Sequence, residues 1–142
     1  MAINILLVDD EIPFLETMTR RLVKREFITA SASSGDEAIR LLEKNGEIEV
    51  VVLDVKMPGM DGLETLKIIR QKFPLIEVIM LTGHATIESA IEGMKLGAFD
   101  YLMKPCDMEE LLSKVREAAM KTKRHKEKII EAQLKEITMR RI

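Results

Sequence analysis

The chain has 142 residues, enough for one domain, and its 46% hydrophobic and 32% charged residues are typical of a globular protein and exclude a disordered one. No apolar run approaches the roughly 20 residues of a membrane span, and the apolar start of the chain lacks the basic flank and cleavage site of a signal peptide. The net charge of −2 is too small to indicate a nucleic-acid partner for the chain as a whole, and the single cysteine, Cys106, excludes an internal disulfide and favours a reducing, cytoplasmic setting.

The first part of the chain alternates between apolar runs and helical periodicity. Ile3–Val8 is an almost continuous apolar run, which predicts a strand buried on both faces. Apolar residues then recur at helical spacing over residues 14–22. Ile28–Ala32 alternates apolar and polar residues, as an edge strand does, and residues 34–46 have the start signal, periodicity and Asn-Gly end of a second helix.

The same alternation continues in the rest of the chain. Short runs rich in apolar residues predict three further strands, which are Val50–Leu53, Val78–Leu81 and Phe99–Met103. Helical spacing of apolar residues predicts three further helices, which are residues 63–69, 87–94 and 108–118. Five strand–helix alternations predict an α/β domain with a parallel sheet that is covered by helices on both faces.

The last part of the chain differs in charge. Residues 120–142 contain eight Lys/Arg and three Asp/Glu, a net charge of +5, which leaves −7 on the remainder. Ile130, Leu134 and Ile137 keep helical spacing in this segment. We therefore expect one domain over residues 1–120, followed over residues 121–142 by a basic extension of the last helix, by a linker, or by a dimerising segment.

Polar residues stand at the carboxyl ends of four predicted strands. Asp9 and Asp10 follow the first strand, Asp54 follows the third, Thr82 ends the fourth, and Lys104 follows the fifth. Ligands of open α/β sheets bind at this edge of the sheet. We therefore expect these side chains to meet in one crevice.

The expected crevice has the chemistry of phosphoryl transfer. Carboxylates held close together repel one another unless a cation joins them, and oxygen ligands without His or Cys indicate Mg²⁺. A carboxylate such as Asp54 can act as a nucleophile and form an aspartyl phosphate without a general base. Mg²⁺, the Lys104 ammonium and the Thr82 hydroxyl could each contact one phosphoryl oxygen.

Four motifs in the expected order resemble those of response-regulator receiver domains. They are the acidic run Leu6–Glu11, the loop Asp54–Gly62, the loop Leu81–His84 and the segment Gly97–Pro105. The resemblance extends from about Ile3 to Ala119. It implies the flavodoxin-like sheet order 2-1-3-4-5 of chemotaxis-type regulators, with residues 1–120 as the receiver domain.

The resemblance also assigns roles around the acidic pocket. Asp54 would accept the phosphoryl group and would also be one of the Mg²⁺ ligands. Asp10 would bind Mg²⁺ directly, Asp9 would bind it directly or through water, and the backbone carbonyl of Lys56 would complete the protein ligands. Lys56 and His84 flank the pocket, and we hypothesise that they set the lifetime of the phosphate by controlling the access of water.

Further residues would couple the pocket to a distant surface. Lys104 would pair with the phosphoryl group, and the Lys104–Pro105 peptide would be cis. Thr82 would move toward the phosphoryl group, and Tyr101 would turn inward into the space that Thr82 leaves. The resemblance thereby implies a change at the surface formed by the fourth helix, the fifth strand and the fifth helix.

The implied function is a signalling switch and not an enzyme, apart from its own phosphorylation and dephosphorylation. The phosphoryl donor would be a sensor histidine kinase or a phosphotransfer protein, and the output would be a partner protein or an effector domain of a larger transcriptional regulator. A homodimer formed on phosphorylation is a further option, and no membrane or nucleic-acid partner is expected. A phosphatase with an aspartyl intermediate would need a second acid at position 56, where this chain has Lys56. Nucleotide binding would need a glycine-rich phosphate loop after the first strand, and this chain has none there. The complete acidic set argues against a receiver-like module that is never phosphorylated.

Overall fold

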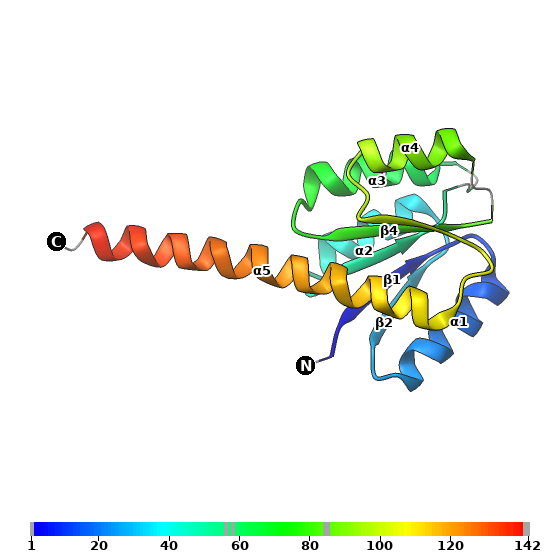
Figure 1. Cartoon of the computed structure of the whole chain (residues 1–142), viewed down its shortest axis with the longest axis horizontal. Coiled ribbons are helices and arrows are strands. Elements are labelled where there is room, and N and C mark those ends of the chain that lie inside the picture. Colours follow the sequence, from blue (N-terminus) through cyan, green and yellow to red (C-terminus); the bar gives the residue numbers. More distant parts are fainter. Residues whose placement is uncertain (1, 56, 58, 84–85, 141–142) are drawn as a thin grey trace.

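Strands and helices alternate strictly along the chain in the computed structural model, which describes residues 2–55, 57, 59–83 and 86–140 (Figure 1). All ten expected elements are present, with boundaries that differ from the expected ones by a few residues except at the end of the last helix. The elements are β1 (Asn4–Val8), α1 (Ile12–Lys24), β2 (Ile28–Ala32), α2 (Gly35–Lys44), β3 (Val50–Leu53), α3 (Gly62–Lys72), β4 (Glu77–Thr82), α4 (Ile87–Lys95), β5 (Asp100–Met103) and α5 (Met108–Arg140).

The five strands form one parallel sheet in the order β2-β1-β3-β4-β5. This confirms the expected 2-1-3-4-5 order. The crossover from β1 to β2 runs one way along the sheet and the crossover from β2 to β3 runs the other way, so the sheet has a switch point beside β1, where ligands bind in folds of this kind. β2 is an edge strand, as its alternating sequence predicts, and Ile28 at its start is 55% exposed.

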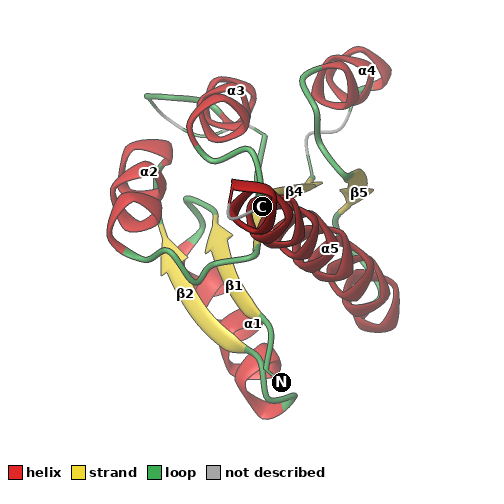
Figure 2. Ribbon diagram, turned by 90° about the vertical axis from the view of Figure 1, so that its left-hand side faces the viewer, coloured by secondary structure: helices red, strands yellow, loops and turns green. Residues whose placement is uncertain are grey.

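Helices cover both faces of the sheet, α1 and α5 on one side and α2, α3 and α4 on the other (Figure 2). Successive strand residues point to opposite faces, so β3 contributes Val50 and Val52 to the first core and Val51 and Leu53 to the second. All four residues are buried. The apolar runs of β1, β3 and β4 are therefore continuous because these strands are buried on both faces, as expected in a parallel sheet.

Three helices on the second face begin with side-chain caps. The Ser34 hydroxyl accepts from the Glu37 amide (3.2 Å), and the Asp61 carboxylate accepts from the Glu64 amide (2.9 Å). At α4, Thr86 and Ser89 form a reciprocal capping box. Each cap satisfies an amide that has no partner within its helix, which fixes where the helix begins.

Helix α5 runs for 33 residues and continues well past the body of the domain (Figure 1). For residues 121–142 the sequence allowed an extended helix, a linker or a dimerising segment. The structure has a continuous helix up to Arg140. Within residues 2–140, the last fully buried side chain among those described is Thr122, whose hydroxyl donates to the Glu49 carbonyl (3.1 Å). Beyond it, residues 123–140 form the α5 extension, which is exposed except for two half-buried residues near its start. Along the described residues no helix combines the length and the apolar composition needed to cross a bilayer.

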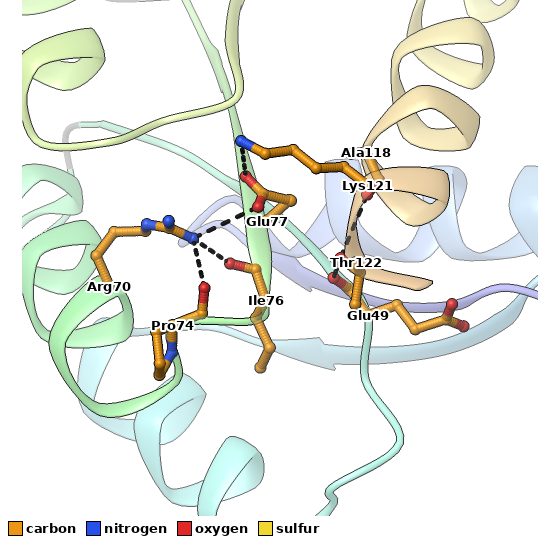
Figure 3. A network of polar contacts seen from close by, with 8 residues as sticks. All are labelled: Glu49, Arg70, Pro74, Ile76, Glu77, Ala118, Lys121 and Thr122. Atoms are coloured by element: carbon orange, nitrogen blue, oxygen red, sulfur yellow. Dashed lines mark hydrogen bonds and ion pairs between the residues drawn. The ribbon is translucent and has the colours of Figure 1, made fainter. Parts of the chain in front are cut away.

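A buried carboxylate anchors the root of the α5 extension at the amino-terminal edge of the sheet. Glu77, the first residue of β4, is fully buried between Arg70 of α3 and Lys121 of α5, at 3.7 Å and 3.6 Å (Figure 3). The same Arg70 guanidinium donates to the carbonyls of Ile76 (2.6 Å) and Pro74 (3.2 Å). This network joins α3, β4 and α5 at the end of the domain that lies opposite the predicted site.

Candidate functional site

Backbone hydrogen bonds hold the predicted site residues at the carboxyl edge of the sheet. The Asp9 amide donates to the last carbonyl of β2 (3.1 Å), and the Asp54 amide donates to the last carbonyl of β1 (2.9 Å). The Lys104 amide donates to the Thr82 carbonyl at the end of β4 (2.9 Å). The sheet ladder therefore continues by one residue into the site, which brings Asp9, Asp54, Thr82 and Lys104 to one edge as the sequence predicts.

Three carboxylates gather at this edge. Asp9, Glu11 and Asp54 each offer an oxygen, and these oxygens lie within 4.8 Å of one another. Asp9 and Asp54 are each only 2% exposed, whereas Glu11 is exposed. The Oδ1 atom of Asp54 is buried and has no hydrogen-bond partner among the described residues. A buried carboxylate oxygen without a donor is costly, so this atom marks where an incoming group would be stabilised.

Lys104 reaches across the edge from the end of β5 to the start of α1. Its Nζ atom donates to Asp9 Oδ2 (2.5 Å) and to Glu11 Oε1 (3.2 Å). The same ammonium lies 4.0 Å from the centroid of the Phe14 ring. The Lys104–Pro105 peptide that follows is cis, which confirms the expectation.

Burial and charge shift the pKa values of two groups in the site. Burial raises the pKa of Asp9, and this effect outweighs the hydrogen bonds from Lys104 and the Glu11 amide, while the nearby Asp54 carboxylate raises the pKa further. Burial on its own would lower the pKa of Lys104, but the hydrogen bond and charge of Asp9, together with Glu11, raise it overall. Lys104 therefore stays an ammonium, and Asp9 is an acid whose ionisation is resisted.

The start of α3 is packed directly on the strand end that carries Asp54. The Gly62 amide donates to the Val55 carbonyl at 2.6 Å. A Cβ atom on Gly62 would collide with the backbone of Asp54 and Val55, so only glycine allows this approach. Asp61, which caps α3, and Gly62 thus fix the loop that begins at Asp54.

Thr82 and Tyr101 lie between the site and α4. Thr82 is fully buried at the last position of β4. The half-buried Tyr101 of β5 has its hydroxyl 3.0 Å from the Ser89 hydroxyl of α4, and its ring lies beside Gly93. Tyr101 therefore links β5 to α4.

Helix α4 carries an apolar surface that the domain leaves uncovered. Its helical periodicity is confirmed, but Ile87 is 81% exposed, Ile91 51% and Met94 46%. Met103 of β5, at 59%, lies on the strand that pairs with β4 at the sheet edge. Periodic apolar residues predict a helix with an apolar face, and here part of that face points to solvent.

Some predicted residues stand apart from the cluster. Asp10 is exposed and is not one of the three described carboxylates that share the 4.8 Å cluster. Lys56 and His84, predicted as a metal ligand and as flanking residues, lie outside the described residues. The contact of Glu11 with Lys104 was not predicted from the sequence, although Glu11 directly precedes α1 and therefore lies close to the site.

The residues present fit a hard divalent cation. Three carboxylate oxygens from two loops converge, and one of the carboxylates has a buried oxygen without a donor. The cluster contains neither His nor Cys, which excludes the usual donor set of structural zinc. Asp9, Glu11 and Asp54 are thus described residues that could hold the cation.

Comparison with known proteins agrees with the fold. The family model described as the response regulator receiver domain matches residues 5–116. The chain is 34% identical over 129 residues to a putative NtrX-like response regulator of Rickettsia bellii, and 39% identical over 111 residues to the regulatory protein AtoC of Escherichia coli. These alignments cover 89% and 78% of this chain but 27% and 24% of the relatives, so the chain spans about a quarter of their length.

A solved structure gives the same result. The crystal structure of a response regulator receiver domain protein from Clostridium thermocellum is 36% identical to this chain, with a TM-score of 0.81. The match covers 85% of this chain and 97% of that protein. The family model, the parallel sheet order and the acidic edge together establish that this chain belongs to the response regulator receiver domain family of two-component signalling.

Proposed function

We propose that this receiver is a phosphorylation-controlled switch that accepts a phosphoryl group on Asp54. The observation that carries the proposal is the buried, unpartnered Oδ1 atom of Asp54, which lies among two further carboxylates with the Lys104 ammonium beside them. An anionic carboxylate needs no general base to attack phosphorus. The acidic edge thus holds a nucleophile and the charges that would surround its product.

The proposed donor is a phosphohistidine of a sensor kinase or phosphotransfer protein. An Asp54 carboxylate oxygen bonds to phosphorus, the phosphorus–nitrogen bond breaks, and the electron pair remains on the imidazole. Mg²⁺ bound by Asp9, Asp54 and a third acid, Asp10 or Glu11, would neutralise charge on the phosphoryl oxygens. Lys104 would pair with another of these oxygens, and the Thr82 hydroxyl would donate to a third.

The proposed output is a change at the surface of α4, β5 and α5. Thr82 moves toward the phosphoryl group, and Tyr101 leaves Ser89 and turns inward. The exposed residues Ile87, Ile91 and Met94 make this surface suitable for an apolar contact. The partner is an output protein, an effector domain, or a second copy of the phosphorylated chain. The relatives are about four times as long as the matched region, so an effector domain could lie in the same chain.

This proposal makes the chain a cytoplasmic signalling component that does not turn over free substrates. Its phosphate is lost by attack of water on the aspartyl phosphate, and Lys56 and His84 are the residues proposed to control that rate. Multiple turnovers of a generic phosphomonoester by the wild-type chain would contradict this part of the proposal.

The deciding experiment is labelling of the wild-type chain with a small phosphodonor in the presence and absence of Mg²⁺. We expect one Mg²⁺-dependent phosphate per chain in wild type and none in Asp54→Asn, which keeps the shape of the side chain and removes its charge. Asp36→Asn, an exposed site on α2, is the matched control and should label like wild type. Labelling that persists in Asp54→Asn would refute the assignment.

A separate experiment tests the coupling to the surface. In Lys104→Ala, labelling should persist while the phosphorylation-induced change at α4 is lost. Chemical shifts of the Ser89 and Tyr101 amides report that change, and size-exclusion chromatography of the same samples shows whether phosphorylation produces a dimer. Wild-type-like shift changes in Lys104→Ala would contradict the role given to this lysine.

A further inference from the structure

Lys104 belongs to a closed ring of contacts with the start of α1. Its ammonium donates to Asp9 Oδ2 and to Glu11 Oε1, and the other oxygen of Asp9 accepts from the backbone amide of Glu11 at 2.9 Å. Phe14, one turn further along α1, presents its ring to the same ammonium at 4.0 Å. The acidic residue before α1 and the ring one turn later thus hold the lysine from two sides.

This arrangement occupies Lys104 with partners other than the phosphoryl acceptor. Within the described part of the chain, its ion pairs are with Asp9 and Glu11, and Asp54 Oδ1 has no hydrogen-bond donor at all. An ammonium has three donor hydrogens. Two are used by the carboxylates and the Phe14 ring faces the ammonium, so a phosphoryl oxygen on Asp54 competes with these partners for Lys104.

Glu11 is the partner that can be displaced. Asp9 is buried and is also held by the Glu11 amide, whereas the Glu11 side chain is 62% exposed and its carboxylate can turn into water. Exposed ion pairs are weak and readily exchanged. Glu11 also makes no side-chain capping hydrogen bond to α1, so its carboxylate has no evident part in starting the helix.

We propose that Glu11 is a positioning residue that holds Lys104 at the start of α1 in the unphosphorylated receiver and thereby slows phosphorylation of Asp54. This inference rests on the proposed function. The competition is between two anions for one ammonium, the Glu11 carboxylate before transfer and the phosphoryl group during it. The identity of the residue directly after the acidic pair would then tune how readily this receiver accepts phosphate.

The experiment compares the Mg²⁺-dependent labelling rates of wild type and Glu11→Gln with the same small phosphodonor. Loss of the negative charge should speed labelling about two- to fivefold, the range expected from weakening one exposed ion pair. Glu16→Gln on the exposed side of α1 makes the same change in net charge without a contact to Lys104 and should leave the rate unchanged.

A double-mutant cycle separates this mechanism from simple charge repulsion. In a Lys104→Met background, which is expected to label still, Glu11→Gln should have no further effect if Glu11 acts through Lys104. An equal acceleration in that background would mean that Glu11 merely repels the donor, and it would overturn the inference. A slower rate with weaker Mg²⁺ binding by calorimetry would also overturn it, because Glu11 would then act as a carboxylate for the cation.

A second readout needs no phosphodonor. The ¹⁵N and ¹H signals of the Lys104 ammonium should shift in Glu11→Gln and remain in place in Glu16→Gln. If wild type and Glu11→Gln are labelled at the same rate, the inference about Glu11 is refuted and the proposed function stands. Wild type that does not label refutes the proposed function, and the rate effect with it, whereas the ammonium signals still report whether the ion pair exists.

Discussion

Asp54 is buried, and one of its oxygens has no donor in the part of the chain that the structure describes, which has an energetic consequence at the scale of the residue. Asp9 lies close by and is equally buried, so two buried carboxylates are neighbours, and the Lys104 ammonium pairs with Asp9. Burying charge that is incompletely paired lowers stability. The site is thus arranged for a ligand at some expense to the stability of the metal-free fold.

Divalent cation should therefore stabilise the wild-type chain. At a free Mg²⁺ concentration about ten times Kd we expect the free energy of unfolding to rise by about 1.4 kcal/mol. Asp54→Asn should be more stable than wild type in chelator and should lose the response to Mg²⁺. Urea denaturation with and without Mg²⁺ measures both effects, and a full response in Asp54→Asn would contradict the assignment of this residue to the cation site.

The raised pKa of Lys104 predicts a loss of stability at alkaline pH. Because the folded-state pKa lies above the ordinary value of 10.5, the contribution of Lys104 is fully present below that value and disappears as pH rises through the folded-state pKa. The difference in unfolding free energy between wild type and Lys104→Met should stay constant below pH 10.5 and shrink as the pH rises above that value. Urea titrations in chelator test this, and a difference that also stays constant above pH 10.5 would show that the ion pairs contribute nothing.

The sequence was sufficient to predict which strand ends supply the site, because parallel strands place their carboxyl ends at one edge. Asp9, Asp54, Thr82 and Lys104 follow from that rule. The partners of Lys104 do not, because a long side chain chooses among nearby acceptors by its torsions and by the shape of α1. The contacts with Glu11 and Phe14 depend on that local packing, and so does the outward position of Asp10.

Secondary-structure elements were predictable where one pattern decides them. The continuous apolar runs of β1, β3 and β4 have one explanation, which is burial on both faces. Helix α4 is different, because its periodic residues indicate an apolar face without indicating what covers it. The structure leaves Ile87, Ile91 and Met94 exposed, so the same pattern that packs a helix elsewhere here supplies a surface.

The network around Glu77 gives a prediction about how elements are held together. Arg70→Met leaves the buried carboxylate with the half-exposed Lys121 and removes two carbonyl contacts, so we expect a loss of about 2 to 3 kcal/mol. Lys121→Met should cost less than about 1 kcal/mol, because its side chain is 45% exposed.

The control for this prediction is the double variant in which Glu77→Leu is added to Arg70→Met. A buried ion pair replaced by apolar residues is often neutral, so most of the lost stability should return. Urea denaturation of the single and double variants gives the comparison. Equal losses in Arg70→Met and Lys121→Met would show that burial does not rank these two cations.

At the scale of the whole molecule, the boundary of the receiver body remains a prediction. Sequence composition placed it near residue 120, and the contacts of α5 reach Thr122 and the half-buried Lys126. A chain ending at Lys126 should unfold within about 0.5 kcal/mol of the full chain. A chain ending at Ala119 should lose about 1 to 3 kcal/mol, because it lacks the Lys121 and Thr122 contacts.

Urea denaturation of the three chains measures these differences, and the signal at 222 nm reports the helix that each one retains. If the chain ending at Ala119 proves as stable as the longer ones, the body ends before Lys121. Composition could not decide this, because the change to a basic sequence begins before the last buried contact. A helix that continues through that change obscures the border.

The projecting α5 extension amplifies any rotation of α5 that occurs at its root near Thr122. Its 18 residues from 123 to 140 span about 27 Å at the rise of an α-helix. A rotation of about 10° at the root would carry the far tip through about 5 Å, by the same helical geometry. A rotation that moves atoms in the sheet only slightly can thus displace the far end of a straight helix by about the length of a side chain.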